Sequence, residues 1–73
     1  MEIIDRGKAQ LVDGQVIVNS TKANLINHFF FNHIIKKGTL GSLSVGEMKQ
    51  DTSFVILSTN KLDNSLINWF ITN

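Results

Sequence analysis

The two histidines are the residues of this chain whose type first suggests chemistry, because imidazole is a common ligand of zinc, nickel and iron. His28 and His33 lie five positions apart, so on an unbroken strand they point to opposite faces and cannot bind one ion together. A threefold axis could bring three copies of either histidine into a ring. A polar role at a strand end or subunit interface is the simpler interpretation, and we expect no metal and no cofactor.

Motifs that mark common catalytic sites are absent from the sequence. It contains neither the G-x-S-x-G motif of a serine nucleophile nor the H-E-x-x-H motif of a zinc peptidase. The segment G-T-L-G at 38–41 is too short to cradle a phosphate and is better explained as a turn. The acidic residues lie mostly in or beside predicted turns, where we expect solvated carboxylates: Glu2, Asp5, Asp13, Glu47, Asp51 and Asp63. We therefore predict a protein that is not an enzyme.

Length and composition limit how the chain can be stabilised. With 73 residues and no cysteine, it is one small domain without disulfides or a thiolate zinc site. A domain of this size buries only about 60% of the surface that its unfolded chain exposes, so its stability is marginal. Small domains compensate with disulfides, metals or oligomers, and oligomerisation is the option open to this sequence.

Charge and hydropathy argue against two classes of partner. The net charge of +1 is too small for the basic surface of a nucleic-acid-binding protein. No apolar run approaches the roughly 18 residues that a transmembrane helix needs. We expect neither nucleic acid nor a membrane as a partner.

Turn-forming residues divide the chain into short segments rich in strand formers. The segments lie at 8–18, about 25–35, 42–48, 54–58 and 66–72, and the first is itself divided by Asp13-Gly14. About six strands with turns every 8 to 12 residues predict an all-β fold, a small antiparallel, jelly-roll-like sandwich. Gly46 is a candidate for a β-bulge.

The clearest local signal is a hairpin centred on Asp13-Gly14. This dipeptide supplies the positive φ values of a two-residue type I′ turn, which matches the natural twist of paired strands. The register that follows predicts three facing pairs: Val12 and Gln15, Leu11 and Val16, and Ala9 and Val18.

Three of the predicted strands carry apolar side chains on both faces. In N-H-F-F-F-N-H-I-I at 27–35, one set of alternate apolar residues faces the core and the other set faces outward. Soluble monomers rarely expose a contiguous apolar patch, so we interpret the outward set as a subunit interface. We assign Phe30, Ile34, Leu66 and Phe70 to that interface. The core set is Phe29, Phe31, Phe54, Ile56 and Trp69, with Ile35 on the same face as Phe29 and Phe31.

Four motifs follow one another along the chain. They are G-x-A-x-L-V-x-G-x-V-x-V at 7–18, G-T-x-G-x-L-x-V at 38–45, T-S-F-x-I-x-S at 52–58 and L-D-x-S-x-x-x-W at 62–69. In order and spacing they resemble a small β domain found at the carboxyl end of many bacteriophage fibre, spike and other virion proteins. The middle of the chain, N-L-I-N-H-F-F-F-N-H-I-I-K-K at 24–37, is longer than the corresponding segment of that family.

The resemblance implies a homotrimer on a phage particle, attached to the head or the tail. We expect a non-enzymatic virion structural protein, a short fibre or knob that projects from the surface and adheres to a host glycan or receptor. Residues 1–6 would be an anchor to other virion proteins through Ile3 and Ile4, and residues 7–73 a single β domain. The polar loops at 19–24 and 59–65 would then contact the receptor.

Two other classes of function stay open. A small β-barrel could bind single-stranded nucleic acid, with Phe29, Phe30 and Phe31 as stacking platforms. A phage-encoded inhibitor or adaptor protein is the third alternative. A stable trimer in solution favours the virion protein, whereas a salt-sensitive monomer that retains oligonucleotide favours the barrel.

Overall fold

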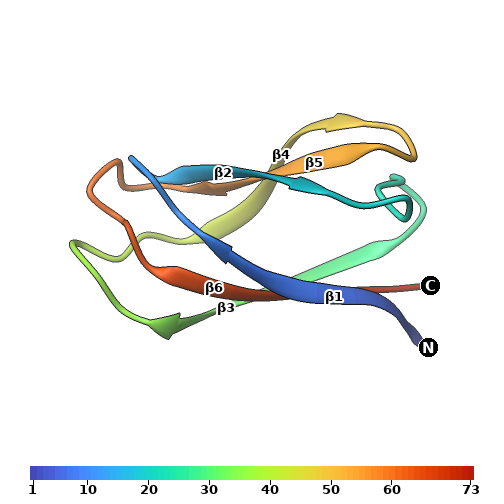
Figure 1. The fold of residues 1–73 in the computed structure, drawn as a ribbon, viewed down its shortest axis with the longest axis horizontal. Coiled ribbons are helices and arrows are strands. Elements are labelled where there is room, and N and C mark those ends of the chain that lie inside the picture. The colour runs from blue at the N-terminus through green and yellow to red at the C-terminus, as the bar shows by residue number, and fades with distance from the viewer.

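The computed structural model describes the whole chain, residues 1–73, as six β-strands without a helix. The strands are β1 (Ile3–Gln10), β2 (Gln15–Asn19), β3 (His28–Ile35), β4 (Leu43–Lys49), β5 (Ser53–Ser58) and β6 (Leu66–Thr72) (Figure 1). The predicted all-β fold of about six strands is confirmed. No helix of sufficient length and apolarity to cross a membrane is present.

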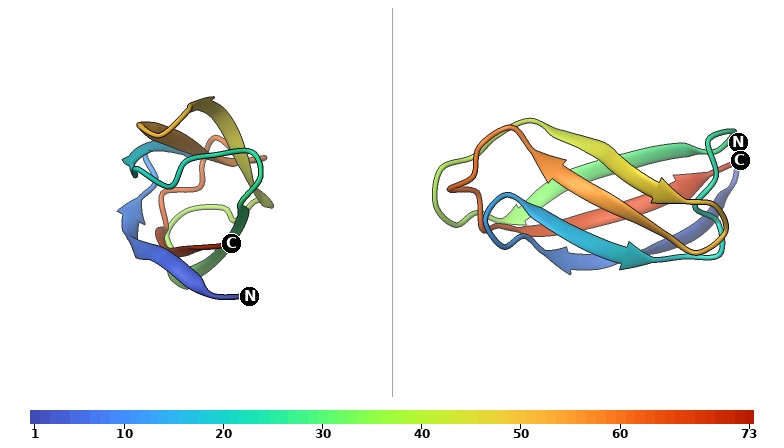
Figure 2. Two further views of the ribbon diagram at one scale, coloured as in Figure 1. Left: turned by 90° about the vertical axis from the view of Figure 1, so that its right-hand side faces the viewer. Right: turned by 90° about the horizontal axis from the view of Figure 1, so that it is seen from above.

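The strands form two antiparallel sheets of three strands that pack face to face (Figure 1). The first sheet has the order β1-β6-β3 and the second sheet the order β2-β5-β4. Both chain termini lie at one end of the sandwich, close to the loop that joins β2 to β3 (Figure 1, Figure 2). The β1–β2 turn, the β3–β4 loop and the β5–β6 loop lie at the other end (Figure 2).

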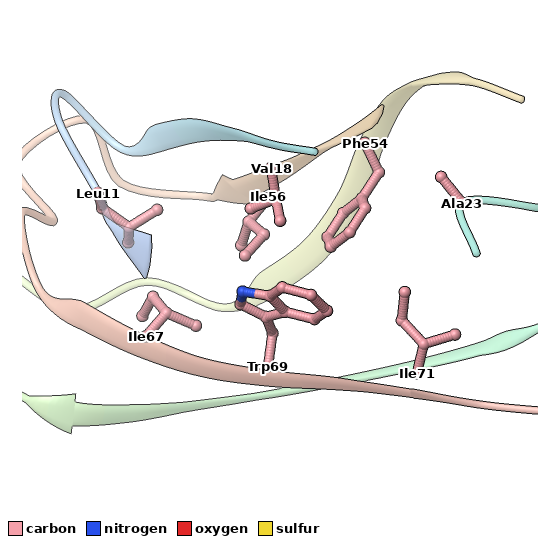
Figure 3. Packing of buried hydrophobic residues seen from close by; sticks show 8 residues of the cluster. All are labelled: Leu11, Val18, Ala23, Phe54, Ile56, Ile67, Trp69 and Ile71. Carbon is pink, nitrogen blue, oxygen red and sulfur yellow. The ribbon is translucent and has the colours of Figure 1, made fainter. Parts of the chain in front are cut away.

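The core between the sheets is built mainly from alternate residues of the two central strands, β5 and β6. Phe54, Ile56, Ile67 and Ile71 are fully buried, and Trp69 is 5% exposed (Figure 3). The ring of Phe54 meets the indole of Trp69 edge-on, with centroids 5.3 Å apart and planes at 80°. The predicted core residues are confirmed, since Phe29 and Phe31 of β3 pack against this cluster.

The predicted Asp13-Gly14 turn is present, but it joins strands that belong to different sheets. Asp13 has a φ of 55° and Gly14 a φ of 80°, as a type I′ turn requires at both central positions. Val12 faces Gln15 in an isolated bridge, so the first predicted pair is confirmed. Beyond this bridge the two arms of the hairpin separate.

The other two predicted pairs, Leu11 with Val16 and Ala9 with Val18, are wrong. β1 pairs with β6, and β2 pairs with β5. The backbone N–H of Leu11 donates instead to the carbonyl of Ser65, 2.9 Å away, so the loop before β6 takes the hydrogen bond that the hairpin would need. The four apolar side chains still contribute to one core: Ala9 of β1 and Leu11 just after it, with Val16 and Val18 of β2.

A β-bulge in β3 changes which side of the first sheet Ile35 occupies. The register of β3 against β6 shifts between His33 and Ile35, and Ile35 becomes the partner of Leu66. Ile35 is 63% exposed, so its predicted place beside Phe29 and Phe31 is wrong. The physical reason is the extra residue of the bulge, which reverses the alternation of faces beyond it.

The first sheet begins earlier in the chain than expected. β1 starts at Ile3, and Ile3, Asp5 and Arg6 pair with Thr72, Ile71 and Phe70 of β6. Residues 3–6 are therefore part of the sheet, with a register irregularity between Ile3 and Asp5. An anchoring role for residues 1–6 stays a prediction.

Candidate assembly face and buried Asp63 cluster

Side chains that point away from the core form three rows across the first sheet. Ile67, Trp69 and Ile71 point inward, so the alternate residues of β6 point outward, and direct partners on β1 and β3 share their face. In the order β1, β6, β3, the rows are Arg6–Phe70–Phe30, Lys8–Asn68–Asn32 and Gln10–Leu66–Ile35. These rows, together with Ile34 at the bulge, are called the outer face below.

On β6 and β3, the two ends of the outer face are apolar. The rings of Phe30 and Phe70 stack with centroids 4.8 Å apart and planes at 11°. Phe30 is 39% exposed, and at the other end Ile34 is 40% exposed. All four residues predicted for the interface lie on this one face, and their role in an interface stays a prediction.

The polar side chains of the outer face are cations and amides. The three rows contain Arg6 and Lys8 on β1 and no carboxylate. A shallow depression between β1 and β6 is lined by both cations together with Asn68 and Phe70. The amide Nδ2 of Asn68 lies 3.5 Å from Oδ1 of Asn32. The β1 side of the face is therefore polar, whereas the β6–β3 side is mainly apolar.

The two residues predicted as an anchor have different surroundings. Ile3 is 52% exposed at the start of β1. Ile4 is partly buried and packs against the chain's own core. Of the two, only Ile3 presents most of its side chain to a partner.

A buried carboxylate links the loops at the end of the sandwich opposite the termini. Asp63 is fully buried. Its Oδ2 accepts hydrogen bonds from Nε2 of His33 (2.8 Å), the hydroxyl of Ser58 (2.9 Å) and the backbone N–H of Gly41 (3.1 Å). Its Oδ1 accepts one from the backbone N–H of Ser65 (3.2 Å). One carboxylate thus connects β3, the β3–β4 loop, the end of β5 and the β5–β6 loop.

The ionisation of Asp63 depends on the balance between burial and these donors. Burial disfavours the charged carboxylate and by itself would raise the pKa of Asp63. The hydrogen bonds from His33, Ser65, Gly41 and Ser58 outweigh burial and hold the pKa well below its ordinary value of 3.8. Asp63 is therefore an anion at neutral pH, surrounded by protein donors rather than by water.

The predicted solvated turn carboxylate at position 63 is wrong. Local sequence explains the error, because the bond from Ser65 N–H to Asp63 Oδ1 is the ordinary contact of an Asx turn. Of the other donors, His33 and Gly41 come from distant positions, and Ser58 lies five residues before Asp63 at the end of β5. The signal that could have identified Asp63 is its place in the L-D-x-S motif at 62–65. Asp5 also differs from the prediction, since it lies within β1 and accepts a hydrogen bond from the hydroxyl of Ser20.

The histidines have separate environments. His33 is committed to Asp63, whereas His28 is exposed at the first position of β3. No group of three or more histidine, cysteine, aspartate or glutamate side chains is placed to hold a metal ion.

The two loops predicted to contact a receptor do not form one exposed surface. The loop at 19–24 lies at the end that holds the termini, and the loop at 59–65 lies at the opposite end (Figure 2). Each loop also contains fully or largely buried residues, which are Ser20 and Ala23 in the first and Asp63 and Ser65 in the second. Each loop is therefore exposed only in part, because it packs against the sandwich through its own hydrogen bonds. Contact of these loops with a receptor stays a prediction.

The consecutive phenylalanines do not form a continuous stacking platform. Phe29 and Phe31 point to the core, where each lies beside Phe54 with ring centroids 5.0 Å and 6.5 Å apart. Phe30 alone faces outward, and it stacks on Phe70 of the same chain. The proposed row of three aromatic platforms for nucleic-acid bases is therefore wrong.

Comparison with known families places the chain among phage proteins. Residues 4–72 match the family described as "K1 capsule-specific polysaccharide lyase, C-terminal domain". Comparisons with curated proteins and with solved structures give no significant match. The family match agrees with the resemblance to carboxyl-terminal domains of phage fibres and spikes. The chain belongs to the family of the K1 capsule-specific polysaccharide lyase C-terminal domain, which is a domain of phage tail spikes.

Proposed function

We propose that this protein is a non-enzymatic structural component of a phage virion that assembles as a homotrimer. It forms a short fibre or knob, or the tip of a longer spike, on the surface of the particle. Two observations support the proposal: the family match over residues 4–72, and an apolar outer face that a small monomer would have to leave in water. The apolar outer face is the observation that supports the trimer.

The apolar part of the outer face is larger than a scatter of single surface residues. The stacked pair Phe30 and Phe70 lies at one end, and Ile34, Ile35 and Leu66 lie at the other. Isolated exposed apolar residues are common on monomers, whereas contiguous patches usually mark interaction sites. A domain of this size also gains stability from assembly that its own core cannot supply.

The arrangement of the acidic and basic groups supports a structural role. Asp63 is fully buried and accepts four hydrogen bonds from protein donors, so this carboxylate is not accessible to an incoming substrate. His33 uses Nε2 in the same cluster. These two groups have the types found in hydrolytic sites, and both act here as connectors between loops.

We propose that the particle binds the domain at the end of the sandwich where both chain termini lie, and that the opposite end points outward. The amino terminus and the exposed Ile3 lie at that end, where other virion proteins would bind. The lyase in the family's name acts on a capsule polysaccharide, so we place this protein in host attachment. The opposite end of the sandwich would then be the part nearest the host surface.

Light scattering on matched variants tests the assembly. Phe30→Asp places a charge on the outer face and should convert the trimer into monomer or unfolded chain. Ile17→Asp is the control, because Ile17 is 71% exposed on β2 of the second sheet and its replacement should leave a trimer. A wild-type monomer, or a trimeric Phe30→Asp variant, would contradict the proposed interface.

Imaging of phage particles tests the place of the protein in the virion. Particles that lack the domain should lose a surface projection and adsorb more slowly to the host. Particles complemented with the Ile17→Asp variant should regain both properties, and those complemented with Phe30→Asp should not. Mutant particles that keep every projection and adsorb normally would reject both the fibre and the attachment role.

A further inference from the structure

We propose that Asn32 and Asn68 disfavour asymmetric trimers in which one copy is shifted along the common axis. The partner is a second and a third copy of this chain, and the inference rests on the proposed trimer. The two asparagines lie opposite one another on β3 and β6, in the middle row of the outer face. An aromatic row lies on one side of them and an aliphatic row on the other.

The apolar residues constrain the direction of the threefold axis. Leu66 and Phe70 lie four residues apart on β6, a separation of about 13 Å along the strand at roughly 3.3 Å per residue. An axis that crosses the strands would cover one end of the outer face and leave the other end in water. An axis that runs along the strands covers both ends, so the strands of the first sheet lie approximately parallel to it.

A rotation about such an axis preserves the height of each residue along it. Side chains of one row therefore meet side chains of the same row in the next copy. The trimer contains three layers as a result: an aromatic layer with Phe30 and Phe70, an amide layer with Asn32 and Asn68, and an aliphatic layer with Leu66 and Ile35. In a closed cyclic trimer, the β1 edge of the sheet in one copy faces the β3 edge of the sheet in the next copy. This arrangement allows residues of the same row to form a layer.

The cations fit this arrangement. Arg6 and Lys8 lie on β1, the edge strand, so they flank the axis and stay apart from their symmetry copies. Arg6 shares the aromatic row and comes to the height of Phe30 in the next copy, where a cation and a ring attract each other. Lys8 shares the amide row and reaches the height of Asn32, whose Oδ1 is an acceptor. No carboxylate in these rows competes for either cation.

The amide layer makes slipped alignments unfavourable. Within one chain the contact from Asn68 Nδ2 to Asn32 Oδ1 is long, at 3.5 Å, so both amides retain capacity for partners in other copies. In an asymmetric trimer with one copy shifted by one row, these amides would lie against phenylalanine or leucine, and buried polar groups would be left without partners. A single buried asparagine layer fixes register in coiled coils in the same way, at a cost in stability.

Disulfide trapping tests the layers. Because the chain has no cysteine, only the introduced cysteines can form disulfides. Gln10→Cys with Ile35→Cys is a same-row pair, and Lys8→Cys with Ile35→Cys is a different-row pair from adjacent rows. Within one chain β1 and β3 are separated by β6, or roughly 10 Å, beyond the ~7 Å limit between Cα atoms of a disulfide. The same-row pair should therefore give a covalent trimer on a denaturing gel, and the different-row pair should give monomer.

Leucine variants then test the role of the amides. In the Asn32→Leu/Asn68→Leu background the protein should be more stable, but same-row trapping should fall and different-row trapping should appear. Asn19→Leu is the control, because Asn19 is exposed on β2 of the second sheet, and it should leave trapping unchanged.

The outcomes separate this inference from the proposed function. A wild-type protein that is monomeric by light scattering overturns the trimer itself. A trimer without same-row trapping overturns the layered arrangement. A trimer whose same-row trapping is identical with asparagine and with leucine overturns the aligning role of Asn32 and Asn68.

Discussion

The side chains of His33 and Asp63 meet between β3 and the β5–β6 loop, with Nε2 of His33 2.8 Å from Oδ2 of Asp63. They are 30 positions apart in the sequence. The same oxygen also accepts hydrogen bonds from Ser58 and Gly41. One anion therefore connects β3, the β3–β4 loop, the end of β5 and the β5–β6 loop at this end of the sandwich.

Replacing Asp63 by Asn should destabilise the protein strongly. The amide has nearly the same shape, but it offers an N–H₂ group where one carboxylate oxygen accepted hydrogen bonds, so donors are left facing a donor. Leaving one partner of a buried charged network unpaired costs about 3 kcal/mol or more. Urea denaturation followed by far-ultraviolet circular dichroism measures the change in the free energy of unfolding.

Asp51→Asn is the matched control for that variant. Asp51 is exposed, and its φ of 59° is one that asparagine also tolerates. Its replacement should change the free energy of unfolding by less than about 0.5 kcal/mol. Equal urea midpoints for the two variants would show that the Asp63 cluster contributes nothing to stability.

The contribution of Asp63 should disappear in acid. Its pKa in the folded protein is below the ordinary value of 3.8, so the unfolded chain takes up a proton first as the pH falls. Stability from this carboxylate is complete above pH 3.8 and decreases below it. The difference in the free energy of unfolding between wild type and Asp63→Asn should therefore be constant from pH 7 to 5 and narrow below about pH 4.

Sequence patterns were sufficient for the strands and for most of their faces. Alternation in β6 predicts Ile67 and Trp69 on one face of the strand and Leu66 and Phe70 on the other, and the structure has the same two faces. Alternation works because each strand has one face toward a single core. It failed for Ile35, since a bulge depends on the partner strand and leaves no clear mark in the sequence of β3.

Pairing between strands was less predictable than their existence. The Asp13-Gly14 turn has the chemistry of a hairpin, and its local geometry is as predicted. Which strands pair beyond the turn depends on contacts with β5 and β6, some 40 or more residues later in the chain. The Asp63 cluster was missed for the same reason, because two of its donors, His33 and Gly41, are distant in sequence from Asp63.

Gly7→Ala should destabilise the core through Trp69. A Cβ atom at position 7 would lie 2.8 Å from Cζ2 and 3.0 Å from Cε2 of the indole. The ring is rigid and 5% exposed, so it cannot move without disturbing the packing of the two sheets. Overpacking of this kind costs about 1–3 kcal/mol, and urea denaturation together with the near-ultraviolet spectrum of the single tryptophan measures it.

Gly46→Ala is the comparison for Gly7→Ala. Gly46 lies within the bulge of β4, where the register against β5 shifts between Val45 and Met48, which confirms the bulge predicted there. A Cβ atom at this position would meet Cδ1 and Cγ of Leu57, 2.7 Å and 2.8 Å away. Leu57 is only half-buried and its torsions can rotate, so the loss should stay below about 1 kcal/mol. A larger loss for Gly46→Ala than for Gly7→Ala would contradict this explanation.

The thermal stability of the wild type should rise with protein concentration. If the outer face is buried only in the trimer, unfolding is coupled to dissociation, and mass action favours the folded trimer as the concentration increases. A tenfold increase stabilises each chain by about 0.9 kcal/mol, which corresponds to roughly 4–7 °C in Tm for a domain of this size. Scanning calorimetry at three concentrations measures the shift, and Ile17→Asp should show the same slope. A Tm independent of concentration in the wild type would mean that the outer face is not buried by assembly.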